Sequence, residues 1–204
     1  MQRKIGKVKQ ITRDHGRLRV PQGQYLTEKF PVLSYGPTPD IELNNWNLRL
    51  FGLVENEVTV TWEKFLSLPQ ITVTRDFHCV TQWSRMDNQW EGVSAKNIVG
   101  LAQTKPEVCF VMVHCYGGYT TNISLDVLFE TDVLFAHRHD GESLHSDHGG
   151  PVRLVVPSRY GWKSAKWVSG LELMAEDRMG FWEQLGFHNN GDPWREERFW
   201  SSLA

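Results

Sequence analysis

Segments of alternating or continuous apolar residues recur along this chain at strand length, and they constrain its fold more than any other feature. The run "EVCFVMVHC" at 107–115 is nearly all apolar, which predicts a strand buried on both faces. Further strands are predicted at 46–54, 57–62, 71–79, 132–141, 151–158 and 166–176. Because the helical segments between them are short and scattered, the sequence predicts a single α+β domain with mixed sheets rather than regular β-α-β alternation.

Two of the expected helices carry their own start signals. Thr61 is placed as the N-cap of a short helix that ends before Pro69, and Ser94 as the N-cap of a helix that runs to about 104. A third short helix is predicted to begin near Ser124. The segment "FPVLSYGPTPDI" at 30–41 is rich in proline, so we expect an ordered loop there.

The bulk properties argue against several classes of protein. A net charge of −2 gives no basic bias toward nucleic acid or anionic membrane, and no apolar stretch is long enough to cross a bilayer. The N-terminus shows neither a secretory apolar region nor a twin-arginine pair. Three cysteines at these spacings do not form a disulfide framework. We therefore expect a cytoplasmic, reduced protein with an N-terminal arm at 1–27 and one domain at 28–204.

One cysteine, Cys79, ends the strand-like run "RDFHC" and is soon followed by the polar segment "TQWSR". An unpaired cysteine is commonly a small buried apolar residue. Arg75, His78 and Arg85 lie close in sequence, and cations that turn toward the sulfur would favour the thiolate. A thiolate at this strand end can serve as a nucleophile or as a ligand for a soft metal. The residues alone leave these three interpretations open.

A basic segment, "HGGPVRLVVPSRYGWKSAKW" at 148–167, follows two-thirds of the way along the chain. Its cations are Arg153, Arg159, Lys163 and Lys166. Cations together with backbone N–H groups and a serine suit a phosphate or pyrophosphate, although a solvated basic turn has the same composition. The paired glycines before the proline indicate close approach of the backbone to a ligand and favour the anion site.

Four histidines lie within or just before this segment. They are His137, His139, His145 and His148. No HExxH helix frames them, so a zinc site is not expected.

The segments "FPVLSYGPTP", "FHCVTQWSR", "WEGVSAKNI", "YTTNISLD", "HGGPVRLVVPSRYGWKSAKW" and "GFHNNGDPW" stand in this order along the chain. Together they resemble the molybdopterin domain of the sulfite oxidase family, over about residues 28 to 200. The resemblance extends to bacterial sulfite-oxidase-like oxidoreductases and to the catalytic subunit of the periplasmic methionine sulfoxide reductase. It implies a sulfite-oxidase-type molybdopterin-binding fold, a molybdenum–molybdopterin cofactor (Moco) and a molybdenum-dependent oxidoreductase that transfers an oxygen atom.

The resemblance also implies roles for individual residues. Cys79 stands where the family has the cysteine that ligates molybdenum, and Tyr119 stands where sulfite oxidases place an active-site tyrosine. Arg85 is the third catalytic candidate. The expected cofactor-binding residues are Leu33, Ser34, Tyr35, His114, Cys115, His148, Arg153, Ser164, Ala165 and Lys166. The last three would cradle the terminal phosphate.

The chain departs from sulfite oxidases near the expected substrate. Leu33 stands where they have an arginine, and "TQWSR" replaces an arginine pair that follows their ligand cysteine. A doubly charged oxyanion needs a cationic pocket, so we expect a small-molecule or sulfoxide-type substrate instead of sulfite. His188 and Trp194 either line the pocket mouth or pack in an aromatic tail. No segment resembles a haem domain, so electrons are expected to pass through a separate partner, a cytochrome or a flavoprotein.

Two other functions remain open on the sequence. The fold can serve as a non-catalytic module that binds cofactor or a protein, and Cys79 can be the nucleophile of a thiol enzyme. Rapid alkylation of Cys79 by iodoacetamide would favour the thiol enzyme, because a metal-bound thiolate resists it. Cys109, in the apolar run, is expected to be a packing residue.

Overall fold

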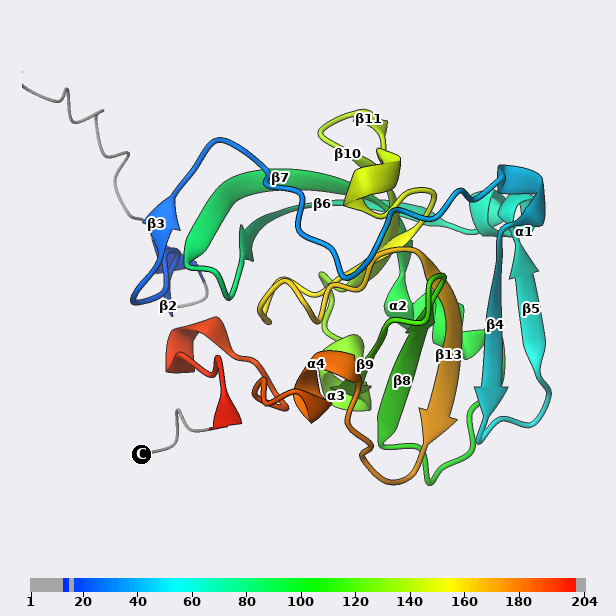
Figure 1. Ribbon diagram of the computed structural model, residues 1–204. Helices are drawn as coiled ribbons and strands as arrows, with labels where there is room; N and C mark the ends of the chain where they lie inside the picture. The colour runs from blue at the N-terminus through cyan, green and yellow to red at the C-terminus, as the bar shows by residue number, and fades with distance from the viewer. Residues whose placement is uncertain (1–12, 15–16, 201–204) are drawn as a thin grey trace, which may run out of the picture.

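The computed structural model describes residues 13–14 and 17–200, which fold around two β-sheets (Figure 1). The five-stranded sheet holds, in spatial order, β5 (Val58–Thr61), β4 (Asn47–Gly52), β13 (Val168–Met174), β8 (Phe110–Cys115) and β9 (Thr120–Ser124). Only β4 and β13 pair in parallel in this sheet. In Figure 1, β8, β13, β4 and β5 stand side by side on the right.

The six-stranded sheet is built around the long strand β7 (Trp83–Ser94). Its other strands are β3 (Tyr25–Leu26), β6 (Gln70–His78), β10 (Leu134–His139), β11 (Glu142–Ser143) and β12 (Arg153–Val155). β6 and β10 flank β7 in antiparallel pairing, and β6 and β7 cross the upper part of Figure 1. β3 pairs in parallel with the start of β7, and β12 joins the sheet through β10.

The helices are short, as the sequence predicts. They are α1 (Trp62–Ser67), α2 (Ala95–Gly100), α3 (Leu125–Leu128) and α4 (Phe181–Gln184), with single 3-10 turns at Leu43–Asn45, Ser146–His148 and Pro193–Arg195. The two predicted caps are present: Thr61 accepts a hydrogen bond from the Lys64 backbone N–H, and Ser94 accepts one from the Asn97 backbone N–H. The predicted α+β class is confirmed.

Two strands of the structure are not among those that the sequence predicts, β7 and β9. β7 contains Asp87, Asn88 and Gly92, which are poor strand formers, but hydrogen bonds to β6 on one side and β10 on the other override that preference.

The N-terminal arm predicted at 1–27 lies in part outside the described residues. Within them, Arg13–Asp14 (β1) pairs with Arg17–Leu18 (β2), and β3 belongs to the six-stranded sheet. The division into an arm and a domain stays a prediction. Across 13–14 and 17–200, no helix combines the length and apolar character needed to cross a membrane.

Two apolar clusters form the interior. The larger lies against the five-stranded sheet, where Leu50 and Leu171 are fully buried, and Ile98 of α2 packs into it. The smaller lies on the six-stranded sheet and holds Phe77, Trp90 and Cys79. Cys79 is therefore packed on one side by a rigid aromatic cluster, which fixes where its sulfur can point.

Candidate functional site

A cavity of about 350 Å³ opens beside the smaller cluster. Five separate parts of the chain line it: the loop 30–35, the β6–β7 connection at 77–83, Tyr119, the segment 148–167 and the segment 182–187. Most of the lining is apolar, and the described lining residues include one arginine, one lysine and no carboxylate. A cavity with an apolar body and a few convergent polar groups is typical of a small-molecule site.

Cys79 lies at the turn between β6 and β7 and lines this cavity. Its backbone N–H donates to the Trp83 carbonyl at 2.9 Å, and its carbonyl accepts from the Gln82 N–H at 3.0 Å. The Thr81 hydroxyl donates to the Cys79 sulfur at 3.1 Å. The turn therefore holds the sulfur at the cavity wall, where only 8% of the residue is exposed.

The cations expected to activate Cys79 are engaged elsewhere, which corrects the sequence argument. Arg75 pairs with Asp132 at 2.7 Å, and Arg85 pairs with Asp140 at 2.6 Å. Burial lowers the pKa of His78 to about 4, so its ring is neutral near pH 7. Burial also raises the pKa of the Cys79 thiol. A buried neutral thiol is a poor nucleophile, but a metal ion that displaces its proton can still bind it.

Arg153, at the start of β12, is the most deeply buried cation of the cavity, with 2% of the residue exposed. Two guanidinium nitrogens donate to the carbonyls of His148 and Ser164, at 2.8 and 2.9 Å. Its Nε is buried and has no hydrogen-bond partner, and no carboxylate among the described residues pairs with it. Burial lowers the pKa of Arg153 to about 9. A buried guanidinium without a counter-charge is costly, so it favours an anionic ligand.

Lys166 provides the second cation and ties the loop 30–41 to the rest of the site. Its Nζ donates to the Ser34 hydroxyl at 2.9 Å and to the Asp147 carbonyl at 2.5 Å. Thr38, further along the loop, donates to the Asp147 carboxylate at 2.7 Å. Burial and the nearby Arg153 lower the pKa of Lys166 to about 7. An anion in the cavity would favour the charged form of this amine.

His148 precedes two glycines that shape the turn into β12. Its ring stacks on Phe30 at 4.6 Å and 3°. Gly149 has φ +107°, and a Cβ there would lie 3.0 Å from the Cβ atoms of Arg153 and Lys166. A Cβ on Gly150 would lie 2.2 Å from the Leu144 carbonyl oxygen. Gly149 therefore allows the two cations to approach the same turn, and Gly150 allows the turn to pack on Leu144.

The remaining predicted lining residues contribute mainly backbone and hydroxyl groups. Ser164 accepts from the Val156 N–H through its hydroxyl at 2.9 Å, and Ala165 accepts from the Leu154 N–H at 2.8 Å. The Tyr119 hydroxyl donates to the Trp162 carbonyl at 2.8 Å. Leu33 and Tyr35 lie on the loop 30–35 and are about half exposed at the cavity entrance.

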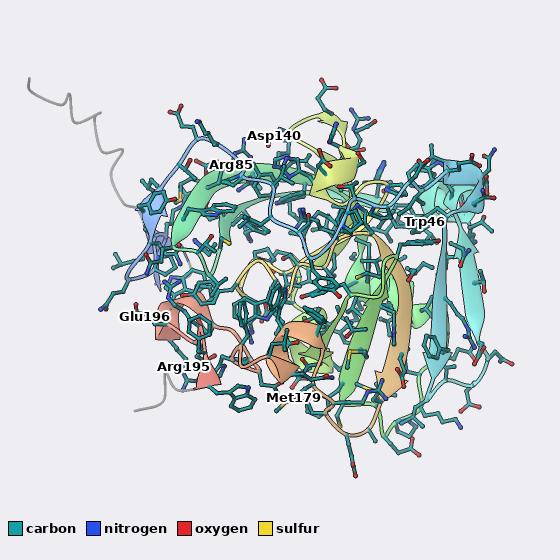
Figure 2. All side chains as sticks on the ribbon, in the orientation of Figure 1. Trp46, Arg85, Asp140, Met179, Arg195 and Glu196 are labelled. Atoms are coloured by element: carbon teal, nitrogen blue, oxygen red, sulfur yellow. The ribbon has the colours of Figure 1, made fainter. Side chains whose placement is uncertain are left out.

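Three predicted site residues do not line the cavity. Arg85 lies beside Asp140 at the upper edge of the molecule in Figure 2, and it also contacts Asn88 and His139. His114 pairs with Glu172 of β13 at 3.0 Å. Cys115 is buried in the larger cluster, and that burial raises the pKa of its thiol far above the usual range.

Several other sequence candidates also have structural partners. Lys163, expected to face an anion, is buried against Glu183 at 2.7 Å, and Arg159 donates to Asn190 at 3.0 Å. His188 accepts hydrogen bonds from the backbone of its own turn and Trp194 donates to the Leu18 carbonyl, so both belong to the packed C-terminal segment. Cys109 is exposed, which contradicts its predicted packing role.

Sequence reasoning missed the aromatic side of the cavity. Trp162, Trp182 and Phe187 line it, and Glu183 lies directly behind Trp162. The only sequence signal was the density of aromatic residues after 160, which does not distinguish a cavity wall from a core. In the described part of the chain, no group of three or more His, Cys, Asp or Glu side chains could hold a metal ion.

Comparison with known proteins decides the family. Residues 35–182 match the family described as the oxidoreductase molybdopterin binding domain. The chain belongs to this family. Its cofactor is therefore molybdenum–molybdopterin, and the resemblance to sulfite-oxidase-type domains is confirmed.

Members of the oxidoreductase molybdopterin-binding family resemble the chain to different extents. The uncharacterized oxidoreductase YuiH of Bacillus subtilis is 43% identical, over 89% of this chain and 92% of that protein. The sulfite oxidase of Arabidopsis thaliana is 30% identical, over 80% of this chain and 51% of its own length. The methionine sulfoxide reductase catalytic subunit MsrP of Campylobacter jejuni is 26% identical, over 87% of this chain and 66% of that protein. The chain thus spans YuiH almost fully but only half of the sulfite oxidase.

A solved structure supports the family fold. The sulfane dehydrogenase SoxCD from Paracoccus pantotrophus superposes with a TM-score of 0.63 at 24% identity, covering 68% of this chain and 40% of that chain. This likeness concerns the fold alone.

The residues of the cavity fit the cofactor that the family binds. A thiol suits molybdenum, a soft metal in this context, and the partnerless Nε of Arg153 together with Lys166 suits the phosphate of the pterin. The absence of a carboxylate from the described lining removes a group that would repel that phosphate.

Proposed function

We propose that this chain is a molybdopterin-dependent oxidoreductase that transfers an oxygen atom to or from a small substrate at a molybdenum held by Cys79. The observation that carries the proposal is the presence of Cys79 and the unpaired Arg153 on the walls of one cavity. When bound, the cofactor supplies the change in oxidation state that accompanies oxygen-atom transfer.

The residues of the chain supply the metal ligand and the positive charges that hold the cofactor. Cys79 provides a thiolate ligand, and the Thr81 hydroxyl donates to its sulfur, which stabilises negative charge there. Arg153 and Lys166 supply positive charge for the phosphate, with Ser34 and Ser164 beside them. Phe30 stacks on His148, and both rings line this end of the cavity.

Tyr119 would face the reacting end of the site. Its hydroxyl donates to the Trp162 carbonyl, and burial together with the charge of Glu183 raises the pKa of Tyr119 well above its usual value. The phenol therefore stays protonated at neutral pH, and its single O–H can donate to a substrate oxygen when it exchanges the bond to the Trp162 carbonyl. One relative, MsrP of Campylobacter jejuni, is named as the catalytic subunit of its reductase, and by analogy we propose that a separate cytochrome or flavoprotein exchanges the electrons with this chain.

The test uses protein purified from a host that makes the cofactor. Elemental analysis should give about one molybdenum per chain, and X-ray absorption should show one sulfur ligand fewer in Cys79→Ser than in the wild type. Reduced benzyl viologen should be oxidised by a sulfoxide with the wild type and not with Cys79→Ser. Cys109→Ser, at an exposed cysteine, is the matched control.

Unchanged sulfur coordination and full turnover in Cys79→Ser would refute the role of Cys79. A molybdenum-loaded wild type with an intact sulfur count but no turnover on any acceptor would favour a non-catalytic binding module instead.

A further inference from the structure

One wall of the cavity is formed by three aromatic rings from the C-terminal part of the chain. Phe187 packs edge-on against Trp162 at 5.1 Å and stacks with Trp182 at 4.9 Å. All three rings line the cavity. We call Trp162, Trp182 and Phe187 the aromatic wall.

A buried network behind the aromatic wall holds it in place. The Glu183 carboxylate oxygen Oε1 accepts from the Trp162 indole N–H at 2.9 Å, from the Thr121 hydroxyl at 2.9 Å and from Lys163 at 2.7 Å. Glu183 and Lys163 are each only 1% exposed. The Glu183 carboxylate thus fixes the Trp162 ring, and Phe187 packs against both Trp162 and Trp182, so the wall is pre-organised before any ligand arrives.

The charges of the cavity lie away from this wall. Arg153 donates hydrogen bonds to the carbonyls of His148 and Ser164, and Lys166 donates one to the Asp147 carbonyl. Both cations are therefore anchored on the segment 147–166. No charged residue among the described lining belongs to the C-terminal segment 182–187. A charged oxyanion placed against the aromatic wall would lose hydration without gaining an ion pair.

The entrance continues the apolar character of the wall. Tyr35 contacts the Phe181 ring at 4.0 Å and lies edge-on to Trp182 at 6.5 Å. Leu33, on the same loop, is 48% exposed and lines the cavity. A ligand that enters between the loop 30–35 and α4 therefore meets apolar and aromatic side chains first.

We propose that the aromatic wall is a specificity subsite that binds the apolar alkyl or aryl group of an uncharged substrate. The proposal rests on the proposed function of the same cavity, and it deepens it by naming the substrate chemistry. The aromatic wall takes the apolar group by ring packing and leaves the oxygen-bearing end of the substrate toward Cys79 and Tyr119.

The test compares two probes that share a phenyl group but differ in charge. Isothermal titration calorimetry on the purified, cofactor-loaded protein should show binding of methyl phenyl sulfoxide and at least about tenfold weaker binding of benzenesulfonate. Trp182→Ala and Phe187→Ala should each weaken sulfoxide binding about tenfold, because each removes a ring-packing contact. Leu185→Ala is the matched control: it lies on the same segment, is 63% exposed and does not line the cavity.

Molybdenum content is measured on every sample, which separates the two proposals. A chain without molybdenum contradicts the proposed function, while sulfoxide binding by the wild type and by the two ring variants still tests the subsite. Equal binding of the two probes, no binding of the sulfoxide, or unchanged binding in Trp182→Ala and Phe187→Ala would each overturn the subsite. A variant that fails to fold is replaced by Trp162→Phe, which keeps a ring but loses the bond to Glu183, and a threefold or greater loss of affinity is then expected.

Discussion

The buried ion pair between Lys163 and Glu183 allows a sharp test of how the aromatic side of the cavity is held. Lys163 also donates to the carbonyl and side-chain oxygens of Asn122, at 2.8 and 3.0 Å. Glu183→Gln keeps an acceptor for Thr121 and Trp162 but removes the charge that faces Lys163. The variant therefore isolates the loss of the counter-charge in a site that water does not reach.

Leaving one member of a buried pair without its partner typically costs about 3–5 kcal/mol. Because Asn122 still solvates Lys163, we expect the lower end, about 3 kcal/mol in the free energy of unfolding, or a fall in Tm of about 6–12 °C for a chain of this size. Lys163→Met combined with Glu183→Gln should recover much of the loss, because no unpaired charge then remains. Their coupling in a double-mutant cycle should reach about 2 kcal/mol or more.

Urea unfolding followed by circular dichroism measures these free energies. Glu57→Gln is the control, because the pair of Glu57 with Arg49 is more than half exposed on both sides and should contribute less than about 1 kcal/mol. A loss below about 1 kcal/mol for Glu183→Gln, or additive losses in the double variant, would refute the role given to this pair.

Three further measurements test other parts of the site. In cofactor-free protein, iodoacetamide should modify the exposed Cys109 faster than the buried Cys79, as read by mass spectrometry, and equal rates would contradict the burial of Cys79. Arg153→Met should lower the retained pterin, measured by fluorescence after denaturation, about tenfold or more, whereas Arg153→Lys should retain part of it. Burial lowers the pKa of His139 to about 4, so the folded protein keeps a neutral ring while the unfolded chain takes up a proton below about pH 6.5. The stability should therefore fall as the pH falls from 6.5 toward 4, and urea unfolding of His139→Gln should show a shallower fall than the wild type.

Local signals made much of the fold predictable. Thr61 and Ser94 cap their helices within a few residues, and the apolar run before Cys115 needs no partner to identify it as a buried strand. β7 could not be found in this way, because its polar and glycine residues become strand only through pairing with β6 and β10. Sequence spacing contains little information about such non-local pairing.

The candidate site was also predictable only in part. The family resemblance placed Cys79, Arg153 and Lys166 on what proved to be one cavity. It could not show that Arg85 turns to Asp140, or that Lys163 turns to Glu183, because the direction of a long side chain depends on partners distant in sequence. The aromatic wall was missed for the same reason.

The cavity is assembled from segments that begin near residue 30 and end near residue 187. No fragment that stops before α4 can enclose a ligand there, so the pterin has to be loaded after synthesis of nearly the whole chain. The hydrogen bond from Lys166 to Ser34 joins the earliest and one of the later of these segments. Delivery of the cofactor to a finished but still accessible polypeptide is therefore a requirement of this architecture.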